Sequence, residues 1–465
     1  MLTVERADPA PAIDISPADE DRARRLHRES TVFICHDHAL SPEAFAAMAR
    51  GGVTGKQLML SVDARIHADK ELFLASTRGR GYTREARRHE RPLELADDRI
   101  DVRALGPAES EGFLKSALIA MDYVYWQVEG SGGRLRIALE ADDVEAAKRD
   151  GALALVLGSE GSRLIEDSLP VLRMLCRLGL RHLQLSWALE TTVGAPQSDK
   201  SGRGLTGFGK DLVRELNRLG VIVDVSHLAV RSQYDALALS RSPVLNSHTG
   251  ASALNPEQPQ LLDDDLIRAF AAKGGVMAIH FMSQVVKPGR QQAKFAQLLD
   301  QFEHVARVAG VDHVACGPDY GELRDGRLWE NQGMTTPFSM TEGVEDVSKM
   351  LNVTRGLVSR GFSDEDIHKI LGGNLLRLFE QVRAARSAEP WEYRNNARFS
   401  TRKREGLLGF TRGGSHFGGD MQPWPAAFNK TLTTQRLHAT FVRRLAFLDG
   451  VQGQNILPGQ IGVRQ

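Results

Sequence analysis

The sequence predicts a (β/α)₈ TIM barrel, an α/β fold, with an inserted segment near the mouth and a C-terminal extension. From about residue 31 to 382, short apolar runs alternate with helical patterns, as in parallel βα units. The runs are nearly continuous in Val, Ile and Leu, which is typical of strands covered on both faces. There are eight runs, the number that closes such a barrel. An open doubly wound sheet is the alternative that strand count alone does not exclude.

The predicted strands are Val32–His36, Val53–Leu60, Ala152–Leu157, His182–Trp187, Val221–Ser226, Val244–Ser247, Val276–Phe281 and His313–Gly317. The second strand has the weakest pattern, because polar residues 55–57 interrupt it.

Helical patterns separate these runs. Over 211–219, leucines recur on one stripe and Gly220 supplies a stop signal. Residues 170–178 and 263–272 behave in the same way. A longer helix is predicted over 364–380, with Ser363 as its N-cap.

The rest of the 465 residues is divided into segments by differences in composition and charge. We predict an N-terminal arm (1–30), the barrel (31–385) with a charged, Arg-rich insertion (63–110) over its mouth, and a basic C-terminal extension (386–465). Lys plus Arg equals Asp plus Glu at 59 each, so net charge gives no reason to expect nucleic acid or membrane partners. The N-terminal residues resemble no secretory signal, and three cysteines suit a reducing compartment, so we expect a cytoplasmic protein.

Candidate metal ligands occur where predicted strands end. They are His36, His38, Glu160, His227, His248 and Asp319. In a (β/α)₈ barrel the carboxyl ends of the strands meet at one face, which is where active sites form. One histidine at a strand end is more often structural than ligating, but the coincidence on several strands predicts a site for two divalent ions, with zinc expected. The buried-looking residues Cys35 and Cys316 are predicted to be core residues, since no Cys-x-x-Cys pair exists.

The segments LGSEG, GFGKDLVRELNRLGVIVDVSH, SPVLNSHTGASAL, GGVMAIHF and GVDHVACGPDYGE resemble the membrane (renal) dipeptidase family of zinc peptidases. This resemblance implies a binuclear zinc site in which His36 opens the first metal motif and Glu160 bridges both ions. It also implies that His227 and His248 complete the second metal site and that Asp319 is the acid/base carboxylate. The expected reaction is hydrolysis of the amide bond of a small, dipeptide-like substrate by a metal-bridging hydroxide, and a homodimer is the default.

Three departures from the family pattern concern the substrate. The first motif of the family is His-x-Asp, whereas this chain has His-Asp-His at 36–38. We favour His38 over Asp37 as the ligand, because adjacent strand residues face opposite ways, and the change would raise the net charge of the centre from about +1 to about +2. Residues 258–260 read Gln-Pro-Gln where the family places a carboxylate-binding Arg. Trp187 stands where many members carry a substrate-contacting His, and His280 is interpreted as structural or at most substrate-facing.

These departures leave three functions in competition. The first is a metallodipeptidase. The second is a related amidohydrolase that acts on a non-dipeptide amide or a biosynthetic intermediate, and the third is a non-catalytic homologue that serves as a binding module.

Overall fold

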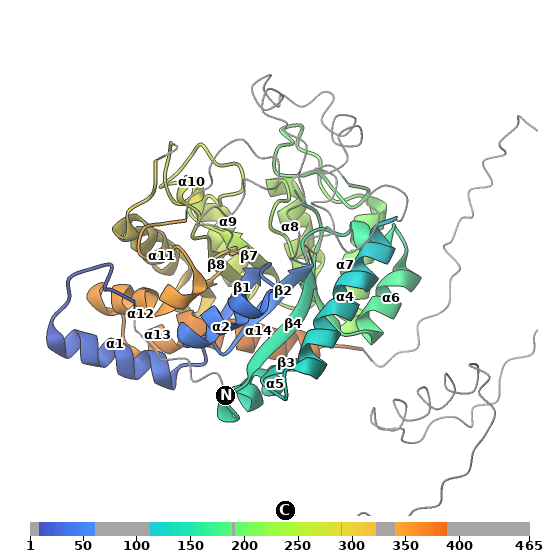
Figure 1. Ribbon diagram of the computed structural model, residues 1–465. Coiled ribbons are helices and arrows are strands. Elements are labelled where there is room, and N and C mark those ends of the chain that lie inside the picture. The colour runs from blue at the N-terminus through green and yellow to red at the C-terminus, as the bar shows by residue number, and fades with distance from the viewer. Residues whose placement is uncertain (1–8, 61–111, 188–190, 290, 322–339, 388–465) are drawn as a thin grey trace, which may run out of the picture. The chain divides into compact units, whose positions relative to one another are not determined.

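Eight parallel strands follow one another around a barrel in chain order, with helices on the outside (Figure 1). The structure is a computed structural model that describes residues 9–60, 112–187, 191–289, 291–321 and 340–387. The barrel strands are β1 (Phe33–Asp37), β2 (Gly55–Leu60), β4 (Leu153–Ser159), β5 (Leu180–Gln184), β6 (Ile222–Asp224), β7 (Leu245–Thr249), β8 (Val276–Ile279) and β9 (Val314–Cys316). The predicted barrel is therefore confirmed, and every predicted strand overlaps an observed one.

The last strand returns to the first and nearly closes the barrel. The backbone N–H of His38 donates to Tyr320 O (2.8 Å), and the N–H of Asp319 donates to His36 O (3.0 Å). A ninth short strand, β3 (Leu135–Ile137), pairs with β4 outside this order and was not predicted. Three residues, two of them only half-buried, are too short a run to give a strand pattern.

The outer layer consists of α-helices that mostly follow the strands. They are α1 (Pro17–Glu29), α2 (Pro42–Arg50), α4 (Gly112–Gly130), α5 (Ala141–Arg149), α6 (Leu169–Arg177), α7 (Gly207–Leu219), α8 (Val230–Leu239), α9 (Asp264–Ala272), α10 (Ser283–Val286), α11 (Phe295–Ala309), α12 (Met350–Ser359), α13 (Asp364–His368) and α14 (Asn374–Ala384). Short turns of helix are η3 (Arg163–Ile165), η4 (Val311–His313), η6 (Val347–Lys349) and the π-helical η7 (Lys369–Gly373). No described helix is long and apolar enough to cross a membrane.

The predicted helix over 364–380 is interrupted. Ser363 caps α13 as expected, but η7 then breaks the regular helix before α14. Gly372 lies against β1, where a Cβ would collide with the backbone of Thr31 and Phe33. The close approach to the strand requires glycine there, and the helix departs from regular geometry as it passes.

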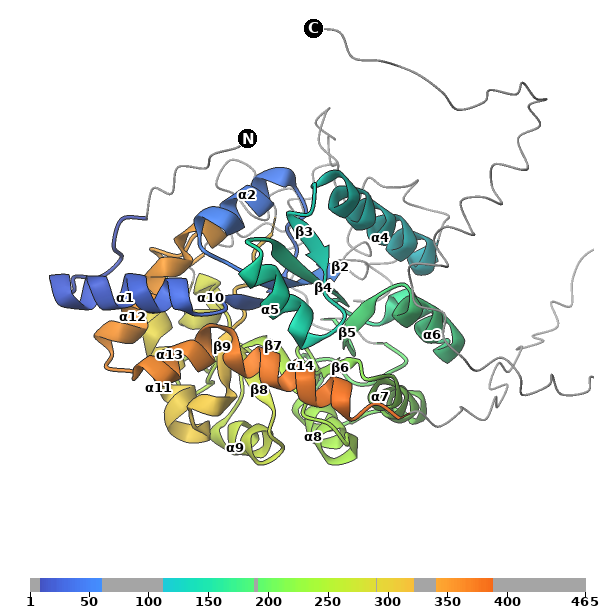
Figure 2. The same ribbon diagram turned by 90° about the horizontal axis from the view of Figure 1, so that it is seen from below.

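The barrel has separate inner and outer apolar clusters. The inner one gathers apolar side chains from alternate strand positions, among them Phe33, Val156, Ile222 and Ala278. Side chains of α14 belong to the same cluster, so this helix closes the amino end of the barrel (Figure 2). With that end plugged, the polar carboxyl ends of the strands form the opposite, open face.

The N-terminal arm is part of the outer layer, because α1 packs along α12. The fully buried guanidinium of Arg355 donates to both carboxylate oxygens of Glu20 (2.8 and 2.6 Å) and to Pro9 O (2.8 Å). The predicted insertion at 63–110 lies outside the described residues, as do residues 388–465 of the predicted extension (386–465).

Replacing Glu20 with Ala is expected to lower the free energy of unfolding by about 3 kcal/mol, because it leaves the buried Arg355 charge unpaired. Glu29→Ala is the matched control on the same helix. It removes only an exposed pair with Arg25, which is worth less than about 1 kcal/mol. Urea unfolding of both variants measures the difference in the free energy of unfolding. Equal losses of stability in the two variants would contradict the stabilising role of the Glu20–Arg355 ion pair.

Candidate metal centre

The predicted ligands meet at the carboxyl ends of the strands. His36 lies in β1 and His38 just after it, Glu160 follows β4, His227 comes after β6, His248 lies in β7 and Asp319 follows β9. Their side chains are at most about 10% exposed. Residues separated by almost 300 positions in the chain thus form one buried cluster at the barrel mouth, as barrel geometry requires.

Backbone strain is concentrated in this cluster. Among the described residues, five non-glycine residues have a left-handed φ, and three of them are His36 (54°), His227 (63°) and Asp319 (57°). The other two are Glu166 and Asp167, in the loop after β4. Such backbone conformations cost on the order of 1–3 kcal/mol each and occur preferentially at functional sites. Here each one turns a strand-end side chain toward the cluster.

The imidazoles form two pairs with a carboxylate between them. The Nε2 atoms of His36 and His38 are 3.1 Å apart, and those of His227 and His248 are 2.8 Å apart. Glu160 Oε1 lies 3.3 Å from His227 Nε2 and 3.4 Å from His36 Nε2. Its other oxygen, Oε2, lies 3.4 Å from His38 Nε2. Among the residues that the structure describes, Glu160 is therefore the one carboxylate that reaches both pairs.

Asp319 occupies the side of the cluster next to the first pair. Its Oδ1 lies 3.3 Å from His38 Nε2 and 3.7 Å from His36 Nε2, and its Oδ2 lies 3.4 Å from His280 Nε2. His280 is almost fully buried, and its ring is 5.3 Å from that of His248. The sequence predicts a structural or at most a substrate-facing role for His280, and the structure places its ring against the Asp319 carboxylate.

Asp37 points away from the cluster, as its adjacent position predicted. Its Oδ1 accepts from Lys56 Nζ (2.5 Å) and from the N–H of Ala39 (2.9 Å). Both charged side chains are essentially inaccessible, with 1% and 0% exposure. Lys56 thus neutralises Asp37 outside the cluster, and the imidazole of His38 takes the place on the inside. β1 does not alternate regularly at this point, because its pairing with β2 shifts register between Ile34 and Asp37.

A shell of polar groups holds the imidazoles by their Nδ1 atoms. Ser247 Oγ lies 3.0 Å from His36 Nδ1 and 2.9 Å from His248 Nδ1. Gln197 Oε1 lies 2.7 Å from His227 Nδ1, and the carbonyl of Met59 lies 3.2 Å from His38 Nδ1. Sequence reasoning missed these partners. The only signal for them is the serine that directly precedes each of two ligand histidines.

Below this shell, a further buried histidine supports the site. His182 Nε2 lies 3.0 Å from Asp224 Oδ2, and both side chains are fully buried. Asp224 Oδ1 accepts from the N–H groups of Ser226 (3.0 Å) and Ser247 (3.2 Å). Burial would raise the pKa of Asp224, but its hydrogen bonds to His182 and Ser247 and the nearby imidazole charges together outweigh burial and lower this pKa. Asp224 therefore orders the backbone that carries the ligands.

The carboxyl groups of the cluster stay ionised. Burial alone would raise both pKa values, but the charge of His36 lowers the pKa of Glu160 well below its usual value. Hydrogen bonding to His38 likewise lowers the pKa of Asp319 against the effect of its burial. The site therefore presents two anionic side chains to whatever cation it holds.

The imidazoles respond in opposite directions. Burial opposes the charge on His38, yet its hydrogen bond to Asp319 and the charge of Glu160 raise its pKa to about 9. Burial and the neighbouring imidazoles lower the pKa of His248 well below its usual value. Burial also lowers the pKa of His280 to about 4, despite the nearby carboxylate of Asp319. The pKa shifts thus favour the protonated form of His38 and the neutral forms of His248 and His280.

The donor set fits a pair of divalent cations. The Nδ1 atoms of His38 and His227 face oxygens of a carbonyl and an amide, which can only accept, so each Nδ1 carries a hydrogen and Nε2 is the atom that can bind a cation, in place of its proton in His38. Within each imidazole pair the Nε2 atoms are about 3 Å apart, and two lone pairs at that distance repel unless a proton or a cation lies between them. Four imidazoles with carboxylates are ligands that zinc accepts. Three overlapping groups of ligand atoms, each within 4.8 Å, share His36, His248 and Asp319 between them.

Other residues considered in the sequence do not join these groups. Cys35 donates to Gln57 Oε1 (2.9 Å), and burial raises the pKa of its thiol and that of Cys316, so both stay protonated core residues. Trp187 is half-buried at the end of β5, and its role in substrate contact stays a prediction. Gln260 lies in the segment that lacks the expected arginine, and its backbone carbonyl accepts a hydrogen bond from Thr249 Oγ1 (3.0 Å).

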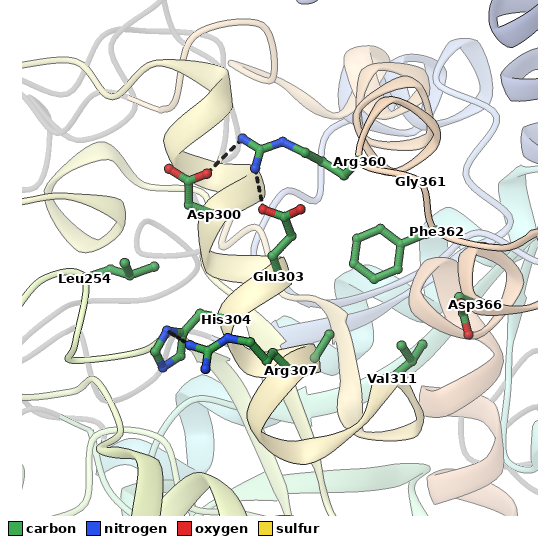
Figure 3. A pocket seen from close by; sticks show the side chains of 11 residues that line it. Leu254, Asp300, Glu303, His304, Arg307, Val311, Arg360, Gly361, Phe362 and Asp366 are labelled. Atoms are coloured by element: carbon green, nitrogen blue, oxygen red, sulfur yellow. Dashed lines mark hydrogen bonds and ion pairs between the residues drawn. The ribbon is translucent and has the colours of Figure 1, made fainter.

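A cavity of about 670 Å³ lies elsewhere, on the outer face of α11 (Figure 3). Its charged side chains are paired with one another: Arg360 bridges Asp300 (2.8 Å) and Glu303, and Arg307 contacts His304 (3.0 Å). The carboxylate–imidazole cluster is not part of its lining. The barrel mouth is therefore the candidate site.

Comparison with known families agrees with this geometry. Residues 104–392 match the family model described as membrane dipeptidase (peptidase family M19). The match begins after β2, so the assignment of His36 and His38 to the cluster rests on the structure rather than on the family model. A dipeptidase, tcpJ, of Claviceps purpurea is 35% identical over 251 residues, which are 54% of this chain and 56% of that protein. A dipeptidase, verJ, of Clonostachys rogersoniana is 30% identical over 272 residues, which are 58% of this chain and 66% of that protein. The matched part of the chain thus spans less than two thirds of these relatives.

Solved structures share the fold at low sequence identity. An amidohydrolase from Pseudomonas aeruginosa has a TM-score of 0.63 and 20% identity, with coverage of 78% of this chain and 99% of that one. A metallo peptidase from Rhodobacter sphaeroides, liganded with a phosphinate mimic of the dipeptide L-Ala-D-Ala, has a TM-score of 0.56 and 22% identity. Coverage is 77% of this chain and 96% of the Rhodobacter chain.

Proposed function

The chain belongs to the membrane dipeptidase family, and on that premise we propose that it is a zinc-dependent hydrolase of the amide bond in dipeptides or dipeptide-like substrates. The observation that carries this proposal is the placement of Glu160 between two imidazole pairs. His36 and His38 would hold one ion and His227 and His248 the other, with the Glu160 carboxylate between the two pairs. The dipeptidase names of the relatives, and the dipeptide mimic bound to the Rhodobacter protein, support the substrate class.

The metal ions, Asp319 and His280 would have different roles in the proposed reaction. When bound, two zinc ions would supply a hydroxide nucleophile near neutral pH and polarise the scissile carbonyl. Asp319 would take the proton of the attacking water and return it to the leaving amine, which converts the peptide into an acid and an amine. Its Oδ2 faces His280, which holds the carboxylate in position at the edge of the cluster. Transfer of this kind contributes about 10²–10⁴-fold to the rate.

The substitution of His38 for an acidic ligand sets the charge of the centre. The imidazole adds no negative charge, and Asp37 is neutralised by Lys56 outside the cluster. We propose that this more positive centre attracts the substrate carboxylate, in place of the arginine that 258–260 lacks.

Changing His38 to Asp is therefore expected to weaken binding of anionic substrates. One added negative charge about 7 Å from a carboxylate, at an effective dielectric of about 20, costs about 2 kcal/mol, or roughly 30-fold in KM. The measurement compares a dipeptide with its C-terminal amide in wild type and H38D at equal zinc content. A loss confined to the free acid supports the proposal, and equal effects on both substrates would contradict it.

A substrate panel tests the function itself. Free dipeptides should be cleaved faster than N-acylated amino acids if the chain is a dipeptidase. The missing arginine favours one alternative, an amidohydrolase that acts on a non-dipeptide amide. Preference for N-acylated amino acids would select that alternative, and zinc-loaded protein that hydrolyses neither class would reject both.

A further inference from the structure

A single hydroxyl group contacts ligand candidates of both proposed ions. Ser247 is fully buried, and its Oγ lies 3.0 Å from His36 Nδ1 and 2.9 Å from His248 Nδ1. The two rings are stacked obliquely with centroids 3.8 Å apart. Their Nε2 atoms diverge from there, one toward His38 and the other toward His227. The hydroxyl thus links the two proposed half-sites, each of which consists of one ion and its imidazole pair.

The donors and acceptors around Ser247 can be assigned by following a buried chain of hydrogen bonds that begins at Gln233. Gln233 Nε2 donates to Leu228 O (2.9 Å), and a carbonyl can only accept, so Gln233 Oε1 is left to accept from Asn246 Nδ2 (3.3 Å). Asn246 Oδ1 then accepts the hydrogen of Ser226 Oγ (2.7 Å).

Ser226 Oγ has therefore used its only hydrogen. One of its lone pairs accepts from the N–H of Ser247 (2.8 Å), and the other can only accept from Ser247 Oγ (3.1 Å). The hydrogen of Ser247 is committed in turn, which leaves two lone pairs on its oxygen. Both His36 Nδ1 and His248 Nδ1 must then carry hydrogens and donate to that oxygen. A neutral imidazole protonated at Nδ1 presents a lone pair at Nε2, which is the atom that each ring turns into the cluster.

We propose that Ser247 is a positioning residue that fixes the tautomer of one ligand to each ion, and so couples the affinities of the two half-sites. The inference rests on the proposed function only in requiring that the cluster binds metal. The other two imidazoles have separate partners: Gln197 for His227 and the Met59 carbonyl for His38. Among the described hydrogen-bond partners of the Nδ1 atoms, Ser247 alone is shared by both half-sites.

Zinc occupancy of the full-length protein, measured across a series of buffered free zinc concentrations, tests this coupling. In S247A, both binding midpoints should move to higher free zinc by about 10–100-fold, the usual effect of losing a group that orients a ligand. In the matched variant Q197L, only the midpoint of the ion held by His227 should move. S232A removes an equally buried hydroxyl that donates to Ala195 O, outside the site, and should leave both midpoints in place.

Unchanged midpoints in S247A, or a shift of only one, would overturn the coupling. Wild-type protein that binds no zinc would overturn the proposed function instead, so the two failures are distinguishable. Imidazole ¹⁵N shifts of zinc-loaded wild type give a second readout that needs no variant. Protons on Nδ1 of both His36 and His248 are expected, and a proton on Nε2 of either ring would contradict the assignment.

Discussion

Replacing Glu160 with Gln is expected to remove nearly all hydrolytic activity and to reduce the zinc content below two ions per chain. The side chain keeps its shape, but it loses the charge that faces His36 and His227 through one oxygen and His38 through the other. Two dications then lack the anion that offsets their mutual repulsion. Loss of several kcal/mol of stabilisation corresponds to a fall in kcat/KM on the order of 10³-fold or more.

Glu166→Gln is the control for this variant. Glu166 lies in the same loop after β4, is exposed, and accepts a hydrogen bond from Leu114 N that an amide oxygen can still accept. Zinc analysis and dipeptide hydrolysis should match wild type in E166Q. Full zinc content and activity in E160Q would show that Glu160 does not bridge the ions.

Replacing Asp319 with Asn should slow catalysis by about 10²–10⁴-fold while the protein stays folded. Asn tolerates the left-handed φ of 57° at this position as well as Asp does, so the backbone can keep its course. The amide cannot take up a proton from water at neutral pH, whereas the carboxylate can. The loss should therefore appear in kcat more than in KM, with little change in zinc content.

Asp312→Asn serves as the comparison, because Asp312 lies just before β9 and pairs with Lys369 at the surface. D312N should retain wild-type kcat. If D319N lost zinc together with activity, Asp319 would be a ligand first and the assigned proton transfer would be wrong. Undiminished kcat in D319N would exclude both roles.

Much of the fold could be predicted because it depends on local composition. Runs such as Val221–Ser226 and Val276–Phe281 are apolar on both faces, and only a strand covered on both sides requires that. The strand β3 and the interruption at η7 could not be predicted in the same way. Pairing with β4 and the approach of Gly372 to β1 are contacts between distant segments, and no local pattern encodes them.

The site, like the fold, could be predicted from the sequence only in part. The ligand candidates could be listed because barrel topology brings strand ends together, whatever lies between them in the chain. The left-handed turns at His36 and His227, the contact of His280 with Asp319 and the salt bridge of Lys56 depend on register and packing. Their residue types are compatible with many other arrangements.

Metal analysis of the purified full-length protein tests the central claim most directly. Four imidazoles and two ionised carboxyl groups converge within a few ångströms at the barrel mouth, and such a cluster is expected to bind about two zinc ions per chain. H227A should then lose one of these ions, because His227 belongs to only one imidazole pair. Wild-type protein that stays free of metal after dialysis against zinc would contradict the claim.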